Sequence, residues 1–145
     1  MATIEVKGLR ELGEAMRLLK AETALKYARA ATGAAARVVK VAAQQNITSS
    51  PSVITRNLYS AVIAKRIPKS QTELTSEHIV TVRGRGKKTR KGNLQAGAPY
   101  AHFVEFGTVK MPAEPFLRPA LERNQQKAIE AMRRPLEKGI IKSRA

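Results

Sequence analysis

Residues 100–120 read YAHFVEFGTVKMPAEPFLRPA and hold all three phenylalanines of the chain, Phe103, Phe106 and Phe116. The chain has no tryptophan and only three tyrosines, so its large rings are concentrated here. Aromatic side chains bury more apolar area than most others and dominate the energetics of cores. We therefore predict that the three rings pack inward and anchor the fold, while Gly107 and the prolines of this segment direct the chain into its last helix.

Length and composition predict one soluble domain. The chain has 145 residues, and we expect a single domain over residues 1–145. It contains no cysteine, which excludes disulfides and thiolate metal sites. The first residues carry charges where a signal peptide needs an apolar run. No stretch approaches the ~20 apolar residues of a membrane span, so we expect no membrane contact.

The charge of the chain is strongly basic and unevenly distributed. The net charge is +16, from 27 basic and 11 acidic residues, and every acidic residue is glutamate. Such an excess predicts an anionic neighbour, either nucleic acid or an acidic protein surface. No acidic residue occurs between His78 and Val104. Within this window the cations are crowded among glycines, and they are Arg83, Arg85, Lys87, Lys88, Arg90 and Lys91.

This basic run predicts a flexible, solvated loop at about residues 84–97, because like charges repel and glycine frees the backbone. Three interpretations of the loop stay open. It has no specific duty, it faces DNA phosphates, or it docks on an acidic protein neighbour. No aromatic residue lies inside the run to stack on a base, so any DNA contact is expected to be independent of sequence.

The pattern ahead of the basic run predicts helices followed by two strands. Apolar residues recur at helical spacing in a short helix after Gly8 and in a long helix over residues 21–45. β-Branched residues predict strands over residues 61–67 and 73–83 that pair with each other. The remaining assignments are a first strand over residues 3–6, a break over 46–52 and a helical turn over 53–60.

The pattern after the basic run predicts a second long helix. It is expected to begin near Phe116 or Pro119, since proline suits a first helical turn, and to end or kink at Pro135. Before it we expect a helical turn or strand over residues 100–105 and a brief strand over 109–111, and after it a tail over 139–145 that is loose or docked on a partner. The predicted buried face carries Leu117, Leu121, Ala128, Met132 and Leu136. The fold class is therefore α+β, with a long N-terminal helix and a C-terminal helix packed on a small antiparallel sheet.

Catalytic chemistry finds little support, and we expect no catalytic residue, no metal site and no cofactor. His78 and His102 are far apart and lack ligand spacing, and the absence of aspartate argues against metal-dependent phosphoryl transfer. Glu105 is the one suggestive carboxylate. It is either an acid or base in an apolar setting or a structural group that bonds amides at the Gly107 turn or pairs with a basic residue. The structural interpretation is favoured.

The aromatic segment resembles a signature of the HK97-type phage tail-component family. The residues Tyr100, Val104, Glu105, Phe106, Gly107 and Thr108 resemble its Y-x-x-x-V-E-[FY]-G-T core. The residues Ala113, Pro115, Phe116, Leu117, Arg118, Pro119 and Ala120 resemble the following A-x-P-F-[LM]-R-P-A. Upstream, Thr55, Leu58, Ser60 and Val62 are similar to T-G-x-L-R-x-S-I, with Arg56 in place of the glycine and Tyr59 in place of the arginine. Residues 6–9 and Leu12 resemble the start of the family.

The resemblance implies a small α+β virion protein at the head–tail junction of a long-tailed phage, similar in role to the lambda minor tail protein Z. Such a protein would be assembled in the host cytoplasm as a homo-oligomeric ring, expected to be sixfold like the tail. Its partners would be neighbouring neck and tail proteins, with DNA in the channel contacted through phosphates. The alternative, which rests on charge alone, is a free, sequence-independent nucleic-acid-binding protein.

Overall fold

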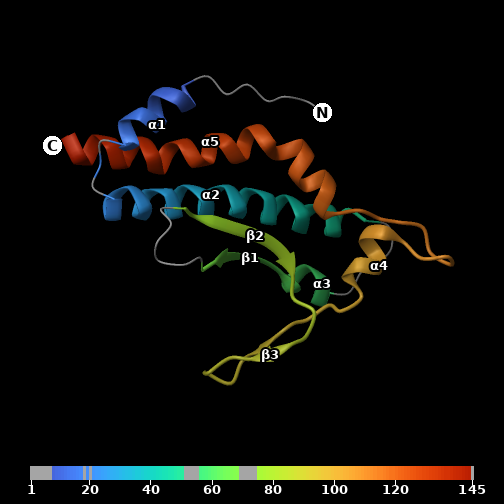
Figure 1. Ribbon diagram of the computed structural model, residues 1–145. Helices are drawn as coiled ribbons and strands as arrows, with labels where there is room; N and C mark the ends of the chain where they lie inside the picture. The colour runs from blue at the N-terminus through green and yellow to red at the C-terminus, as the bar shows by residue number, and fades with distance from the viewer. Residues whose placement is uncertain (1–7, 18, 20, 51–55, 69–74, 145) are drawn as a thin grey trace.

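The computed structural model describes residues 8–17, 19, 21–50, 56–68 and 75–144 (Figure 1). The elements in chain order are α1 (Leu9–Arg17), α2 (Ala21–Thr48), α3 (Arg56–Ala61), β1 (Val62–Ile67), β2 (Glu77–Val82), β3 (Lys87–Lys88), β4 (Leu94–Gln95), α4 (Ala101–Phe106) and α5 (Leu117–Arg144). The predicted α+β class is confirmed, because two long helices pack with a small antiparallel sheet. The strand predicted over residues 3–6 lies outside the described residues.

The two long helices, α2 and α5, run antiparallel and form the most extensive contact in the described part of the molecule (Figure 1). Small side chains on α2 allow the close approach, and Ala31 and Ala36 are buried there. On α5, a Cβ at Gly139 would lie 2.5 Å from ring carbons of Tyr27, so only glycine accommodates the ring. The short helix α1 contacts α5 on the side away from α2 (Figure 1).

The sheet β1–β2 lies against α2 and is strictly antiparallel. Its register pairs Val62 with Val82 at one end and Ile67 with Glu77 at the other. Alternate residues of β2 face the helix, so Val82 packs against the core while Ile79 is 44% exposed. The predicted pairing of the two strands is confirmed.

The imidazole of His78 explains a glycine inside α2. A Cβ at Gly33 would lie 3.3 Å from the His78 Nε2 atom, which is tighter than an ordinary contact. The Nδ1 atom of the same ring lies 2.9 Å from the Thr32 hydroxyl oxygen, which also donates to the Ala28 carbonyl at 2.9 Å. The histidine therefore links β2 to α2, and its ring occupies the space that the missing side chain of Gly33 leaves. This packing offsets the roughly 1 kcal/mol by which glycine destabilises a helix.

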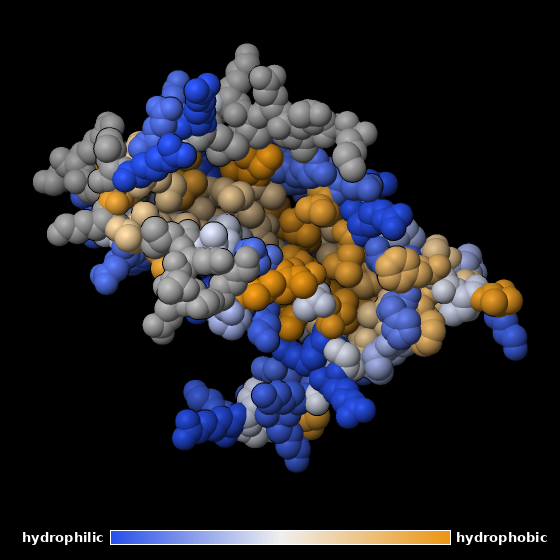
Figure 2. Space-filling model, viewed as in Figure 1, coloured by the Kyte–Doolittle hydropathy of each residue, from blue (hydrophilic) through white to orange (hydrophobic). Residues whose placement is uncertain are grey.

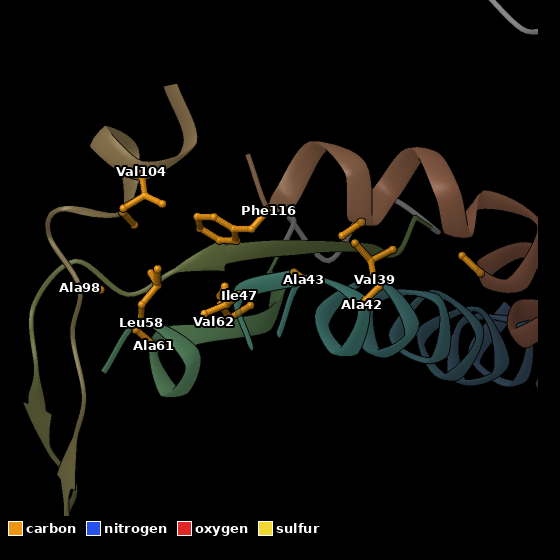
Figure 3. Close-up of a cluster of buried hydrophobic side chains, with 13 residues drawn as sticks. Val39, Ala42, Ala43, Ile47, Leu58, Ala61, Val62, Ala98, Val104 and Phe116 are labelled. Carbon is orange, nitrogen blue, oxygen red and sulfur yellow. The ribbon is translucent and has the colours of Figure 1, made fainter. Parts of the chain in front are cut away.

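The hydrophobic core lies where α2, α3, β1, α4 and the start of α5 meet (Figure 3). Leu58 and Val62 are its largest fully buried side chains. The aromatic segment contributes Val104 of α4 and Phe116, which immediately precedes α5. The other members are mostly small, and they are Val39, Ala42, Ala43, Ile47, Ala61, Ala98, Ala101, Ala120 and Ala128. A core built from so few large side chains depends strongly on each of them.

Both long helices extend beyond their predicted ends. The helix α2 continues to Thr48, through part of the break predicted over residues 46–52. The helix α5 contains Pro135 and continues to Arg144, so the helix does not end at Pro135 and residues 139–144 belong to it rather than to a loose tail. The alternatives of a kink at Pro135 and of docking on a partner stay predictions. Proline removes one helical hydrogen bond. Burial of Leu136 and Ile140 against the rest of the molecule offsets that loss and carries the helix onward.

Two further predictions differ from the structure. The predicted buried face of the last helix includes Leu121, yet this side chain is 52% exposed because it borders an open groove between α5 and β2. The brief strand expected over residues 109–111 is reduced to one isolated bridge between Thr108 and Met111. None of the described helices combines the length and the apolar character that a membrane crossing requires.

Candidate functional site

The cations of residues 83–91 lie on and around a short β-hairpin that projects from the body of the molecule (Figure 1). Strand β3 pairs antiparallel with β4, and Lys87 lies opposite Gln95. The turn between them is closed by Thr89, whose backbone N–H donates to the Asn93 carbonyl at 2.9 Å. The structure thus adds two paired strands to the predicted loop, whose flexibility stays a prediction.

At the base of this hairpin the two arms of the backbone lie very close together, and Arg83 forms a hydrogen bond between them. A Cβ at Gly97 would lie 2.3 Å from the Arg85 carbonyl carbon and from the Gly86 nitrogen, so the two arms approach too closely for any side chain. Arg83 is half-buried, and its guanidinium donates to the Ala96 carbonyl at 3.3 Å. Arg83 therefore positions the hairpin rather than belonging to its exposed surface.

The remaining cations of the predicted set all face solvent, and they are Arg85, Lys87, Lys88, Arg90 and Lys91. We call these five side chains the basic hairpin surface. Since the chain has no acidic residue between His78 and Val104, no carboxylate of the hairpin itself offsets this charge. A projecting surface of this kind attracts polyanions, and at physiological salt its field reaches about 8 Å.

The aromatic segment begins with the short helix α4, and Glu105 of that helix caps another helix. One carboxylate oxygen of Glu105 accepts the backbone N–H groups of Phe116 and Leu117 at 2.8 and 3.0 Å, and the other accepts that of Arg118 at 3.1 Å. The first amides of a helix have no intrahelical partner, and the helix dipole favours an anion there. The carboxylate thus satisfies three donors at the start of α5.

Glu105 therefore has a structural role, but with different partners from those predicted. The amides it bonds lie at the start of α5, 11 to 13 residues away, rather than at the Gly107 turn. After the turn at Gly107 the chain returns to α4, where the Glu114 backbone N–H donates to the Val104 carbonyl at 2.8 Å.

The start of α5 is also tied to the end of α2. The Asn46 side-chain amide donates to the Phe116 carbonyl at 3.0 Å, and the Ser50 hydroxyl donates to the Glu114 carboxylate. Sequence reasoning missed Asn46, Ser50 and Glu114. Their partners lie 64 and 70 residues away along the chain, so no local pattern could reveal the contacts.

Comparison with known proteins identifies the family of this chain. Residues 10–107 match the model of the family described as "Bacteriophage HK97-gp10, putative tail-component". The chain belongs to the HK97-gp10-like family. No curated protein and no solved structure matches the chain.

The HK97-gp10-like match covers α1 to α4, including the basic hairpin surface, Glu105 and Gly107, and it leaves α5 outside. It confirms the predicted resemblance to HK97-type tail components. Membership supports a structural role in a phage tail and a place in the virion, with other tail proteins as partners.

The HK97-gp10-like chain does not bury its aromatic segment as predicted. Phe116 is only 2% exposed, but Phe103 is 47% exposed and Phe106 is 71% exposed. The prediction that all three rings pack inward is therefore wrong for two of them. Helix α4 turns Ala101 and Val104 to the core, and residues two positions later point to the opposite face because each residue advances the helix by about 100°.

The two histidines of this family member lie on separate elements. His78 belongs to β2 and contacts Thr32 of α2. His102 belongs to α4 and is exposed, and the centroid of its ring lies 3.9 Å from that of Phe103. Neither joins a constellation with Glu105, which bonds backbone amides. Among the described residues, no group of three histidine, aspartate or glutamate side chains gathers in a way that could hold a metal ion.

The capping role of Glu105 predicts a measurable loss of stability on substitution. In Glu105→Gln, the side chain keeps its shape but loses the charge and replaces one accepting oxygen by a donor. Hydrogen bonds to charged groups contribute about 1.5–3 kcal/mol and helix caps about 0.5–2 kcal/mol, so we expect the free energy of unfolding to fall by about 1–2 kcal/mol. Urea denaturation followed by circular dichroism measures the change.

The matched control is Glu122→Gln, which removes the same charge from an exposed position one turn into α5. Surface substitutions of this kind usually stay within about 0.5 kcal/mol. Equal denaturation midpoints for Glu105→Gln and Glu122→Gln would show that the three amides do not depend on the carboxylate.

Proposed function

We propose that the protein is a structural subunit of the phage head–tail junction, a neck or tail-completion protein that assembles into a ring and joins tail to head around the DNA channel. The observation that carries the proposal is the match to a family of tail components, which includes a projecting hairpin whose charged side chains are all cationic. Assembly takes place in the host cytoplasm, and the ring is expected to match the sixfold tail. Neighbouring neck and tail proteins are its partners.

Within this ring, the basic hairpin surface is the part suited to DNA or to an acidic ring above or below. Lysine and arginine bind phosphates through charge and counterion release, which requires no sequence readout. The hairpin carries no aromatic side chain for stacking on bases. The fold is stabilised by α2, α5 and the core. The hairpin is therefore available for this contact, because the stability of the molecule does not depend on it.

Complementation of a phage that lacks this chain tests the proposal. We expect the deletion phage to accumulate unjoined heads and tails, and the wild-type chain to restore infectious particles that contain it at the neck in electron micrographs. A variant with Arg85, Lys87, Lys88, Arg90 and Lys91 changed to glutamine is expected to fold but to lose most of this rescue. The control variant changes five other exposed cations, Lys26, Arg29, Arg37, Lys127 and Lys138, and is expected to rescue normally.

The outcomes separate the role in the particle from the role of the hairpin. Normal head–tail joining in the deletion phage, with the chain absent from particles, would refute the structural role. It would favour the alternative, a free sequence-independent nucleic-acid-binding protein, for which the net charge of +16 is the supporting observation. Equal rescue by the two charge variants would retain the structural role and refute the contribution of the hairpin.

A further inference from the structure

The strand β2 has one edge that no strand of the described residues covers, because its sheet contains only β1 and β2. The Arg83 backbone N–H donates to the Ala61 carbonyl, and this bond fixes the direction of the backbone groups in the register of the two strands. These groups alternate in direction along an antiparallel pair. Those of Ile79 therefore bond β1, whereas those of His78 and Val80 point to the uncovered edge.

The uncovered edge of β2 lacks the side chains that normally protect such an edge. Natural sheets discourage the addition of a further strand with lysine, proline or a bulge on the edge strand, or by covering the edge. The neighbouring strand β1 carries Lys65 and Arg66, both exposed. Residues 78–82 of β2 read HIVTV and contain no lysine, arginine or proline. The edge of β2 is therefore the one that accepts a further strand.

This edge borders a groove of about 620 Å³ between β2 and α5, with α2 as its floor. Within the described part of the chain, the strand residues that line the groove are residues 78–80 of β2, and none belongs to β1. The lining is mostly apolar and includes Val39, Val80, Leu121 and Met132. We call it the apolar groove. Figure 2 shows apolar side chains gathered over the middle of this face of the molecule. A strand added to β2 would bury alternate side chains here.

The charge of the apolar groove favours an acidic occupant. Of the described residues that line it, Arg118 carries a full positive charge and none carries a carboxylate. Arg118 is exposed, and no carboxylate of the described residues pairs with its side chain. The helix α5, which forms one wall, has eight lysine and arginine residues against three glutamates. Opposite charges across an interface attract each other, whereas a second copy of this chain would bring a net charge of +16 to this wall.

We propose that an acidic, extended segment of a neighbouring tail protein adds as a strand to the uncovered edge of β2 and fills the apolar groove. Its backbone bonds that of His78 and Val80, its alternate apolar side chains lie in the groove, and a carboxylate pairs with Arg118. In strand addition the main chain supplies affinity and the pockets for alternate side chains supply specificity. The inference rests on membership of a family of tail components and not on a ring or a place at the neck.

A designed peptide that alternates glutamate with valine is the probe, because it has an acidic and an apolar face when extended. Fluorescence anisotropy with the purified full-length protein measures its binding. We expect it to bind at least about tenfold more tightly than the same peptide with lysine in place of glutamate, and than a peptide of equal composition with the two residues in separate blocks. Absence of binding, or equal binding of the block peptide, would overturn the proposal.

Methylation of the peptide backbone separates strand addition from attraction between charges. Adjacent N–H groups of a strand point in opposite directions, so only one alternate set bonds β2. Methylation of that set, either the valines or the glutamates, is expected to weaken binding by about two- to tenfold for each lost bond, and methylation of the other set to leave it unchanged. Equal effects of the two sets would refute strand addition.

Amide hydrogen exchange followed by NMR locates the contact on this chain. The Ile79 amide is expected to exchange slowly with and without the peptide, since it bonds β1. The His78 and Val80 amides are expected to become slow only when the peptide is bound. Unchanged exchange at these two residues with the peptide bound would place it elsewhere, such as on the basic hairpin surface. Protection that rises with protein concentration alone would place a second copy at the edge, and either result would overturn the proposal.

Arg118→Gln tests the charge at the groove, and Arg123→Gln is the matched control, an exposed arginine of α5 outside the described lining of the groove. The cap of α5 is retained in the test variant, because Glu105 bonds the backbone of Arg118 and not its side chain. Arg118→Gln is expected to weaken binding of the glutamate peptide by about two- to fivefold, as loss of an exposed ion pair does. The control is expected to bind like the wild-type chain, and equal losses in both variants would refute the pairing with Arg118.

Discussion

Replacement of Phe116 by alanine is expected to remove a large part of the stability of this protein. The ring is 2% exposed and lies where α3, α4 and α5 meet, among core residues that are mostly alanine and valine. Phenylalanine-to-alanine substitutions in cores cost about 3–5 kcal/mol, because the transfer free energy of the ring and the cavity left behind add together. Domains are stable by only about 5–15 kcal/mol. Urea denaturation at one fixed protein concentration measures the difference.

Phe106→Ala is the matched control for this prediction, since it makes the same chemical change ten residues earlier in the same segment. Phe106 is 71% exposed, so its loss is expected to change the free energy of unfolding by less than about 1 kcal/mol. Phe116→Ala is then expected to unfold at a clearly lower urea concentration than the wild-type chain, and Phe106→Ala at nearly the same concentration. Equal destabilisation by both would refute the observed difference in their burial.

Gly107→Ala is expected to be the second most damaging substitution, because this position excludes a side chain in two ways. Its φ and ψ angles are 75° and 177°, a backbone region that is accessible essentially to glycine alone. A Cβ there would also lie 2.8 Å from the Ala113 nitrogen and 3.0 Å from the Met111 carbonyl oxygen. Both neighbours are backbone atoms, so neither can rotate away. Strain of about 1–3 kcal/mol and the clash together predict a loss of about 2–4 kcal/mol.

The control for this substitution is Gly13→Ala in α1, where nothing lies within 4 Å of the added Cβ. Alanine in a helix is favoured over glycine by roughly 0.5–1 kcal/mol, so the control is expected to stabilise the protein slightly. Thermal unfolding curves of the two variants should therefore shift in opposite directions. A shift of Gly107→Ala toward higher temperature would contradict the strained turn.

Local patterns were sufficient for most elements of the fold. The spacing of apolar residues over 21–45 and the β-branched run over 73–83 predicted α2 and β2, because each pattern follows the period of its own element. Pro119 lies in the first turn of α5, as its fixed φ angle favours. The basic run also predicted a solvent-facing, cationic surface, since charges crowded together remain hydrated whatever the fold.

Choices between equivalent local patterns could not be made from the sequence. In α4, Ala101 and Val104 are three residues apart, and so are Phe103 and Phe106, so both pairs form a stripe on a helix. The larger rings favour the second stripe as the buried one, yet the first stripe faces the core. Which stripe is buried depends on the side of α4 that the rest of the chain covers, and α4 meets the core through Ala101 and Val104.

The sequence by itself determined the two long helices, the paired strands, the cationic run and the family of this protein, because these are properties of neighbouring residues. Only the tertiary structure decided that Glu105 caps α5, that α5 continues past Pro135 and that Phe116 alone of the three rings is buried. Each of these features depends on groups that the fold of the whole chain brings into contact. Hydrogen bonds and burial depend on contacts between residues that are far apart in the sequence, and the spacing of neighbouring residues does not predict such contacts.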